Sequence, residues 1–468
     1  MFRFFFVVIA VCFSRASGAG PMPDLHGLDP DSVAVYAAPV EGGGVPVVWR
    51  ENASVNPAST MKLLTAWAAL SRLGPDYVWR TDLVADAPVV DGVLKGDLYW
   101  VGRGDPRFYL DDLQALVSRL RERGVRAIEG RLVQDRSAFN RIAGSDDFDA
   151  DEGRAFASPP DTHLTNLNVG WLTFYNDASG PRAALEPALP EVPLTVRLTS
   201  RPGSSCANVR DYVSIRHDGR GVVVEGRLPA ACDGARTYVE LMDASSFAHA
   251  SFAWAWRKAG GEGALPAGSG KAPVGARVLA SIDSPTLSRI LPDMLKHSSN
   301  PMARLIFLTL GREAPVDGDV VDGAEACVRE HLLARGIDAT PLVLENGSGL
   351  SRRERVSARL LGEALIAALR GAEGADLAAS LPAAGGEGTL KRRFPALGGQ
   401  LRLKTGSLRD VRSLAGFWQA ADGRRLAIVV VVNRADPGRA VPAMDAIVAD
   451  LVGRFSAAPD AAQAGIMK

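Results

Sequence analysis

The sequence is poor in lysine and histidine and carries no net charge. Only eight of its 53 basic residues are Lys, six residues are His, and Lys plus Arg equal Asp plus Glu at 53 each. A chain without net charge creates no overall basic field that would attract a nucleic acid or an anionic membrane. The six His and four Cys are scattered, and no group of them has the spacing of a zinc site. We therefore expect no nucleic-acid partner, no metal and no cofactor, and each Lys is worth inspecting.

Long hydrophobic runs are also absent. The longest apolar run in the body of the chain, Leu426–Val432, has the length of a buried strand, whereas a transmembrane helix needs about 20 residues. At the N-terminus, Arg3 precedes an apolar run from Phe4 to Phe13 and a set of small residues over 16–20. This pattern is typical of a secretory signal peptide, with an uncleaved anchor or a buried helix as the alternatives. We expect residues 1–20 to be a signal peptide and the mature chain to be exported.

The few cysteines suit an oxidising compartment, where disulfides form and persist. Cys206 and Cys232 flank a stretch of alternating, turn-punctuated sequence that is consistent with a hairpin. We expect a disulfide between them, with three free cysteines as the alternative. Cys327 lies in a helical pattern and is interpreted as a small core residue.

The length of 468 residues indicates more than one domain, because a single core stops growing at about 250–300 residues. Helix and strand patterns occur at both ends of the chain, around a part that is richer in strands. The expected helices cover residues 59–74, 110–123, 247–258, 287–310, 322–335, 357–370 and 441–455, and the clearest strands cover 32–39, 45–49, 399–408 and 424–433. We predict a discontinuous α/β domain of residues 21–80 and 271–457, a β-rich insertion of residues 81–270, and a disordered tail of residues 458–468.

Three short motifs carry side chains that suit one active site. In the first, Ser59 and Lys62 are three apart, which places them on one face of a helix near its N-terminus. Free backbone N–H groups there can hold an oxyanion, and a buried Lys can be neutral and take a proton from Ser. About 0.5 such pairs are expected per chain by chance, so this motif alone is weak.

The second motif is Ser298-Ser299-Asn300, and the third is Lys404-Thr405-Gly406 on a strand, with Ser407 next. The second can line a cleft, although Ser and Asn are also common helix caps. The third places a cation and a hydroxyl beside an incoming chain, and Gly allows close backbone approach. The alternative for the third motif is an ordinary exposed strand end.

The order of the three motifs resembles that of the penicillin-recognising serine enzymes. The 239 residues between Ser59 and Ser298 make the chain similar to the D-alanyl-D-alanine carboxypeptidase/endopeptidase family of the penicillin-binding-protein-4 (DacB, peptidase S13) type. The further stretches that match this family are 102–106, 156–160, 346–352, 388–390 and 393–394. The resemblance implies a serine β-lactamase/DD-peptidase-like transpeptidase fold, with an antiparallel sheet flanked by helices and a β-rich insertion that forms one or two extra domains.

The resemblance also implies roles in the reaction. Ser59 is expected to be the acylated nucleophile and Lys62 its general base. Ser298 is expected to relay a proton to the leaving amine, with Lys404 tuning it, and Asn300 to hold the substrate peptide. The family more usually has Ser-Asp-Asn as its middle motif. Because the flanking residues carry the chemistry, we expect activity with Ser299 at the centre.

The strand motif is expected to bind the end of the substrate. Lys404 and Thr405 would bind the carboxylate of the terminal D-alanine, beside Gly406. The backbone N–H groups of Ser59 and Ser407 would form the oxyanion hole. The expected partners are therefore peptidoglycan stem peptides that end in D-Ala-D-Ala, and β-lactam antibiotics.

A further pocket is expected for the charged side chain of the stem peptide. The resemblance assigns Asp151 and Phe156 from the insertion to it, and Arg352 and Arg409 from the main domain. An acid with Arg suits the zwitterionic end of diaminopimelate. Asp151 is alternatively a solvated residue of the acidic run 146–152, and Arg409 stands where a Gln is expected.

These expectations describe a periplasmic serine DD-peptidase, with a loose association with the membrane left open. The same site would trim stem peptides and cleave cross-bridges. Two alternatives remain: a β-lactamase or esterase on the same fold, and a non-catalytic scaffold that binds the cell wall. Relatives specialised for fast β-lactam turnover usually lack so long an insertion, and the complete set of motif residues argues against a scaffold.

Overall fold

The computed structural model describes residues 22–141, 148, 156–217 and 221–457. The expected signal peptide, Asp151 and the expected tail at 458–468 lie outside the described residues. None of the helices in the described ranges has both the length and the apolar character needed to span a bilayer.

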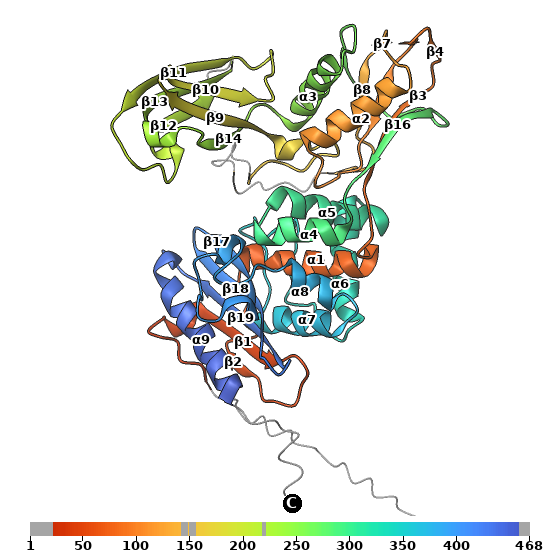
Figure 1. The fold of residues 1–468 in the computed structure, drawn as a ribbon. Helices are drawn as coiled ribbons and strands as arrows, with labels where there is room; N and C mark the ends of the chain where they lie inside the picture. The colour runs from red at the N-terminus through yellow and green to blue at the C-terminus, as the bar shows by residue number, and fades with distance from the viewer. Residues whose placement is uncertain (1–21, 142–147, 149–155, 218–220, 458–468) are drawn as a thin grey trace, which may run out of the picture.

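A five-stranded antiparallel sheet unites the two ends of the chain (Figure 1). Its order is β17-β18-β19-β1-β2. The strands are β1 (Val33–Pro39), β2 (Val47–Trp49), β17 (Leu401–Leu408), β18 (Val411–Gln419) and β19 (Arg425–Asn433). The pairing of Val33 in β1 with Val432 in β19 brings together segments about 400 residues apart in sequence. This confirms the predicted α/β fold with an antiparallel sheet.

Both faces of this sheet are covered by helices. The apolar run at 426–432 is continuous because its side chains alternate between two cores, with Val429 and Val431 in one and Ile428 and Val430 in the other. The first core contains α1, α4, α5, α6, α7 and α8, and the second contains α9 (Figure 1). Their bounds are α1 (Lys62–Leu73), α4 (Leu287–Lys296), α5 (Asn300–Glu313), α6 (Val320–Leu333), α7 (Ala358–Arg370), α8 (Gly374–Ser380) and α9 (Val441–Ala457).

The structure differs from the predicted elements at the places where the motifs lie. The predicted helix at 59–74 begins as a 3₁₀ turn, η2 (Ala58–Met61), and continues as α1. The helical pattern over 287–310 is broken between α4 and α5, where Ser298 has a left-handed backbone with φ of 58°. The strand β18 and the short helix α8 were not among the predicted elements.

The described residues between α1 and α4 form four further sheets and two α-helices, drawn at the top of Figure 1. Two sheets have the orders β15-β8-β6-β3-β16 and β4-β5-β7, and the other two have the orders β10-β9-β14 and β11-β13-β12. The strands are β3 (Arg80–Ala85), β4 (Val89–Val90), β5 (Val93–Leu94), β6 (Leu98–Val101), β7 (Ala127–Ile128), β8 (Leu132–Asp135), β9 (Val169–Asp177), β10 (Gly180–Glu186), β11 (Leu194–Arg201), β12 (Val213–His217), β13 (Val222–Pro229), β14 (Arg236–Glu240), β15 (Ala267–Ser269) and β16 (Arg277–Asp283). The helices are α2 (Leu110–Glu122) and α3 (Ala244–Lys258).

The cysteines behave as the sequence predicts. Cys206 and Cys232 form a disulfide, with their Cα atoms 5.1 Å apart, in the part of the chain that carries β11, β12 and β13. Cys327 is a free, buried residue of α6. The domain boundaries at 80/81 and 270/271 stay a prediction. In Figure 1 the chain passes from α1 into the inserted part through β3 and returns to α4 through β16. These two strands pair with each other.

Candidate active site

The first motif lies where η2 runs into α1. Ala58, just before the expected nucleophile, has a left-handed backbone with φ of 46°, a conformation that costs energy for a residue with a side chain. Lys62 is the first residue of α1, and its Nζ donates a hydrogen bond of 3.0 Å to Ser59 Oγ. The turn therefore presents a partly exposed hydroxyl to a buried amine.

Lys62 is held by two further acceptors. Its Nζ donates to Asn300 Oδ1 at 2.6 Å and to the backbone carbonyl of Ser348 at 2.5 Å. The side chain is fully buried. Burial, and then the nearby charge of Lys404, hold the pKa of Lys62 well below its ordinary value. A lowered pKa favours the neutral amine, which can accept a proton from Ser59.

The second motif occupies the turn between α4 and α5. Ser299 caps α5 by accepting a hydrogen bond from Met302 N, whereas Ser298 and Asn300 contact the other motifs. The helix-cap interpretation therefore holds for Ser299, whereas the role of Ser298 and Asn300 in lining a cleft stays a prediction. Asn300 Nδ2 also donates to the backbone carbonyl of Phe156 at 3.0 Å, which brings a segment of the insertion against the site.

The third motif lies on β17, at the edge of the five-stranded sheet. Lys404 is fully buried, and its Nζ donates to Ser298 Oγ at 2.8 Å and to the carbonyl of Thr405 at 2.6 Å. Burial lowers the pKa of Lys404 to about 7. Thr405 Oγ1 donates to Thr389 Oγ1 at 2.8 Å. The three motifs thus form one continuous set of contacts with two Ser-Lys pairs.

Two glycines allow the backbone to close around the nucleophile. A Cβ at Gly406 would lie 3.0 Å from Ser59 N and 2.8 Å from the carbonyl oxygen of Pro57. A Cβ at Gly349, whose φ is 80°, would lie 1.9 Å from the carbonyl oxygen of Ala58. Only Gly fits such close approaches, and the result is that β17 runs directly beside Ser59 N.

The residues expected in the side-chain pocket are less closely joined. Phe156 is exposed and meets the site through its backbone. The Arg352 guanidinium lies 5.0 Å from the centre of the Phe148 ring, and Arg409 is exposed in the turn after β17. Asp151 lies outside the described residues, so its assignment stays a prediction.

Sequence reasoning missed two contacts of the motif residues, one with a backbone carbonyl and one with a side chain distant in sequence. Ser348 and Thr389 lie in stretches that matched the family, but neither was given a role. The Ser348 carbonyl binds Lys62, and a carbonyl has no signature in a sequence because every residue has one. Thr389 lies before β17 in the sequence, and only the fold brings its hydroxyl to that of Thr405.

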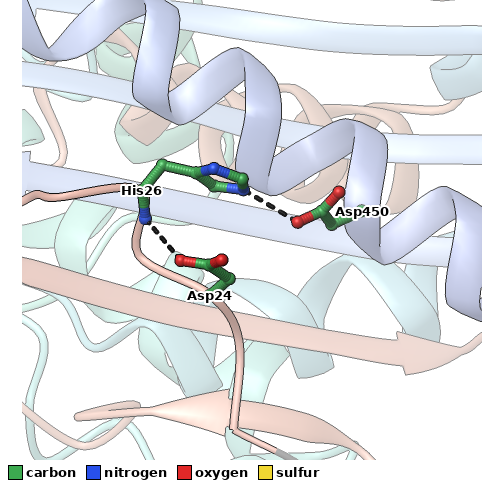
Figure 2. A group of neighbouring side chains, drawn as sticks. All are labelled: Asp24, His26 and Asp450. Atoms are coloured by element: carbon green, nitrogen blue, oxygen red, sulfur yellow. Dashed lines mark hydrogen bonds and ion pairs between the residues drawn. The ribbon is translucent and has the colours of Figure 1, made fainter.

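A separate cluster of possible metal ligands lies far from these motifs in sequence. Asp24, His26 and Asp450 place their donor atoms within 4.8 Å of one another, with His26 Nε2 2.8 Å from Asp450 Oδ2 (Figure 2). Asp24 and His26 are exposed and Asp450 is partly exposed. The contact ties the N-terminal segment to α9. Nothing else about the cluster points to an ion, and the expectation that the chain needs no metal stays a prediction.

Comparison with known proteins agrees with this geometry. The model of the D-Ala-D-Ala carboxypeptidase 3 (S13) family matches residues 23–451. The chain is 31% identical over 400 residues to a D-alanyl-D-alanine carboxypeptidase of Actinomadura sp. (strain R39), a match that covers 81% of this chain and 73% of that protein. It is 26% identical over 390 residues to the D-alanyl-D-alanine carboxypeptidase DacB of Haemophilus influenzae, which covers 80% of each.

The solved structures show the same fold. Penicillin binding protein 4 (dacB) from Haemophilus influenzae superposes with a TM-score of 0.72 at 24% identity, over 86% of this chain and 90% of that one. The predatory peptidoglycan endopeptidase Bd3459 from Bdellovibrio bacteriovorus has a TM-score of 0.52 at 14% identity, over 90% and 92%. The chain therefore belongs to the D-Ala-D-Ala carboxypeptidase S13 family of serine peptidases, whose members are peptidoglycan-related, penicillin-binding hydrolases.

Proposed function

We propose that this protein is a serine-type D-Ala-D-Ala carboxypeptidase and DD-endopeptidase that acts through an acyl-enzyme on Ser59. The observation that carries the proposal is the buried Nζ of Lys62, 3.0 Å from Ser59 Oγ, with a pKa held well below its ordinary value. A neutral amine in this position can accept the proton of the serine hydroxyl, which lowers the barrier to nucleophilic attack.

In the acylation step, Ser59 Oγ gives its proton to Lys62 Nζ and attacks the carbonyl carbon of the penultimate D-alanine. The oxyanion that forms accepts hydrogen bonds from the backbone N–H groups of Ser59 and Ser407. When the tetrahedral intermediate collapses, the peptide C–N bond breaks and the leaving amine takes a proton from Ser298 Oγ. Lys62 passes the proton that it took from Ser59 on to Ser298, which leaves Lys62 neutral for the next step. Lys404, hydrogen-bonded to Ser298, keeps its own proton and tunes this relay.

In the deacylation step, water attacks the ester on Ser59, with Lys62 as the base, and the stem peptide leaves with one D-alanine fewer. When the leaving amine belongs to the side chain of a second stem, the same steps cut a cross-bridge. A β-lactam would acylate Ser59 in the same way. A solved structure of the Haemophilus influenzae relative is a complex with a β-lactam.

Substrate binding is assigned to the strand motif and to the segment at 156. Lys404 and Thr405 bind the terminal carboxylate, beside Gly406, and Asn300 holds the peptide. Phe156, Arg352, Arg409 and Asp151 are proposed to meet the third residue of the stem. The proposed place of action is the periplasm, because the substrate is part of the cell wall and the N-terminus reads as a signal peptide.

The test compares Ser59→Ala with the wild-type protein. Ser59→Ala should abolish both the release of D-alanine from a pentapeptide and covalent labelling by a fluorescent penicillin. Ser71→Ala, near the other end of α1, is the matched control and should retain both. Labelling that persists in Ser59→Ala would overturn the assignment of the nucleophile.

The same assay separates the alternatives. Rapid hydrolysis of penicillin without activity on D-Ala-D-Ala peptides would indicate a β-lactamase. Wall binding without labelling or hydrolysis would indicate a scaffold. Digestion of purified peptidoglycan, followed by separation of the products by mass, measures carboxypeptidase activity and endopeptidase activity separately.

A further inference from the structure

Two opposite charges are buried behind Lys62, and the reaction described above does not use them. Arg304 on α5 and Glu354, in the segment before α7, are both fully buried. Within the described part of the chain, Arg304 Nε and Nη2 and Glu354 Oε2 have no hydrogen-bond partner. Incompletely paired buried charges cost several kcal/mol, about as much as a small domain can spare. Their cost indicates that these two residues do more than fill the core.

Glu354 is connected to the general base through the backbone. Its Oε1 accepts hydrogen bonds from Glu345 N at 3.2 Å and from Asn346 N at 3.1 Å. Asn346 Oδ1 in turn accepts from Ser348 N at 3.0 Å and from Ser348 Oγ at 2.6 Å. The Ser348 carbonyl accepts the 2.5 Å hydrogen bond from Lys62 Nζ. The Glu354 carboxylate thus fixes the turn whose carbonyl orients the amine.

Arg304 is connected to the other side of the site. It follows Asn300 by one helical turn on α5, and its Nη1 donates to the carbonyl of Ser158 at 3.4 Å. Asn300 Nδ2 donates to the carbonyl of Phe156 in the same segment. Both side chains therefore hold the same strip of the insertion, and Asn300 also binds Lys62.

The charged and titratable groups that face Lys62 come from four elements. They are Ser59 on η2, Lys404 on β17, Arg304 on α5 and Glu354 from the segment before α7. Glu345 in turn faces Glu354. After burial, Lys404 and Arg304 lower the pKa of Lys62 and Glu354 raises it. Burial raises the pKa of Glu354 itself, while the N–H groups of Asn346 and Glu345 lower it.

We propose that Glu354 and Arg304 are positioning residues for the acylation step: Glu354 holds the Ser348 carbonyl against Lys62 Nζ, and the two buried charges act on Lys62 with opposite sign. This inference rests on the proposed function, because it assumes that Lys62 is the base for Ser59. It assigns a task to two side chains that do not touch the substrate.

The test measures the second-order rate of Ser59 acylation by a fluorescent penicillin as a function of pH. Acylation falls at low pH as Lys62 takes up a proton. Glu354→Gln removes the charge but keeps an acceptor oxygen, and should move this acidic limb down by about 0.5–1 pH unit. Arg304→Met removes the opposite charge and should move the limb up by a similar amount.

A second carboxylate variant separates charge from position. Glu354→Asp keeps the charge but shortens the side chain, so the limb should stay in place while the plateau rate falls about 10-fold. Glu325→Gln removes a carboxylate on α6 that is paired with Arg329, and should change neither quantity. Thermal unfolding establishes that each variant is folded. If Arg304→Met does not fold, the contrast between the two Glu354 variants decides.

The outcomes are distinct. Opposite shifts of the limb support the inference, because a purely structural defect lowers the rate without moving the limb in two directions. Limbs that stay in place, or that move together, in folded Glu354→Gln and Arg304→Met overturn it. Wild-type protein that is not labelled at Ser59 would instead overturn the proposed function.

Discussion

At the scale of single residues, the site depends on two of the eight lysines being buried. A buried ammonium loses its hydration, so its neutral form is favoured. In the proposed mechanism the two lysines nevertheless have different tasks, because Lys62 must give up its proton to act as a base and Lys404 must keep its proton to bind a carboxylate. Their Nζ atoms bind different serines, Ser59 and Ser298, which keeps the tasks apart.

The first prediction concerns the pH dependence that follows from Lys404. Its pKa of about 7 means that the free enzyme loses the cation on β17 as pH rises through that value. We expect kcat/KM for a D-Ala-D-Ala peptide to fall as pH rises above about 7, since kcat/KM reports ionisations of the free enzyme. The pH profile measures this. The Lys404→Arg variant keeps its positive charge over this pH range, so any remaining kcat/KM should not fall above about pH 7. A wild-type profile that stays flat well above neutral pH would contradict the assignment.

The second prediction concerns the close approach at Gly406. A Cβ there would meet Ser413 Oγ at 2.1 Å, the Pro57 carbonyl oxygen at 2.8 Å and Ser59 N at 3.0 Å. Gly406→Ala should therefore push β17 away from the nucleophile and slow penicillin labelling about 10- to 100-fold. Gly399→Ala, just before β17, is the control, because a Cβ there meets nothing within 4 Å. Equal labelling rates in the two variants would mean that this approach is not needed.

At the scale of elements, the turn between α4 and α5 combines a helix cap with two active-site groups. Ser299 caps α5, while its neighbours Ser298 and Asn300 point to Lys404 and Lys62. The left-handed backbone of Ser298 turns its hydroxyl out of the helical path. We therefore expect the centre of the motif to tolerate any residue that caps the helix.

The third prediction follows from this division of tasks. Ser299→Ala should lose the cap at a cost of about 1 kcal/mol, which lowers the melting temperature by about 2–4 °C. Its labelling rate should stay near that of the wild type. Ser299→Asp keeps a capping oxygen and should melt at the wild-type temperature. A large loss of labelling in folded Ser299→Ala would show that the central residue takes part in the chemistry.

The elements also show how far the sequence could be interpreted. The strands β1, β17 and β19 and most helices follow from their hydrophobic periods, and the three motifs follow from side-chain chemistry and the family resemblance. The 3₁₀ turn at Ser59 was not predicted, because tertiary contacts override helical propensity there. The cap interpretation of residues 298–300 implied a helix start at this place, but not the left-handed backbone of Ser298. The roles of Glu354 and the Ser348 carbonyl depend on backbone geometry, which residue types do not reveal.

At the scale of the whole molecule, the predicted insertion lies between α1 and α4 in the chain. The five-stranded sheet is built from both sides of the insertion, as Figure 1 shows, and residues of the insertion such as Phe139 and Leu164 pack into the first core. The insertion meets the site through a short strip at Phe156–Ser158, which Asn300 and Arg304 hold. We therefore expect its distant sheets to affect stability and large substrates more than acylation by a small β-lactam.

The fourth prediction tests this separation through the disulfide. Cys206 and Cys232 are 26 residues apart, and closing a loop of that size stabilises the folded state by about 2–4 kcal/mol. The variant with both cysteines changed to Ser should unfold its inserted sheets at a lower temperature, as should wild-type protein under reducing conditions. The labelling rate of Ser59 at moderate temperature should not change, because the bond joins the segment after β11 to the turn after β13 and does not contact Lys62. Thermal unfolding measured beside penicillin labelling checks both parts. A parallel loss of labelling would mean that the far sheets support the site, since the strip at Phe156 is the contact through which their unfolding would reach Asn300.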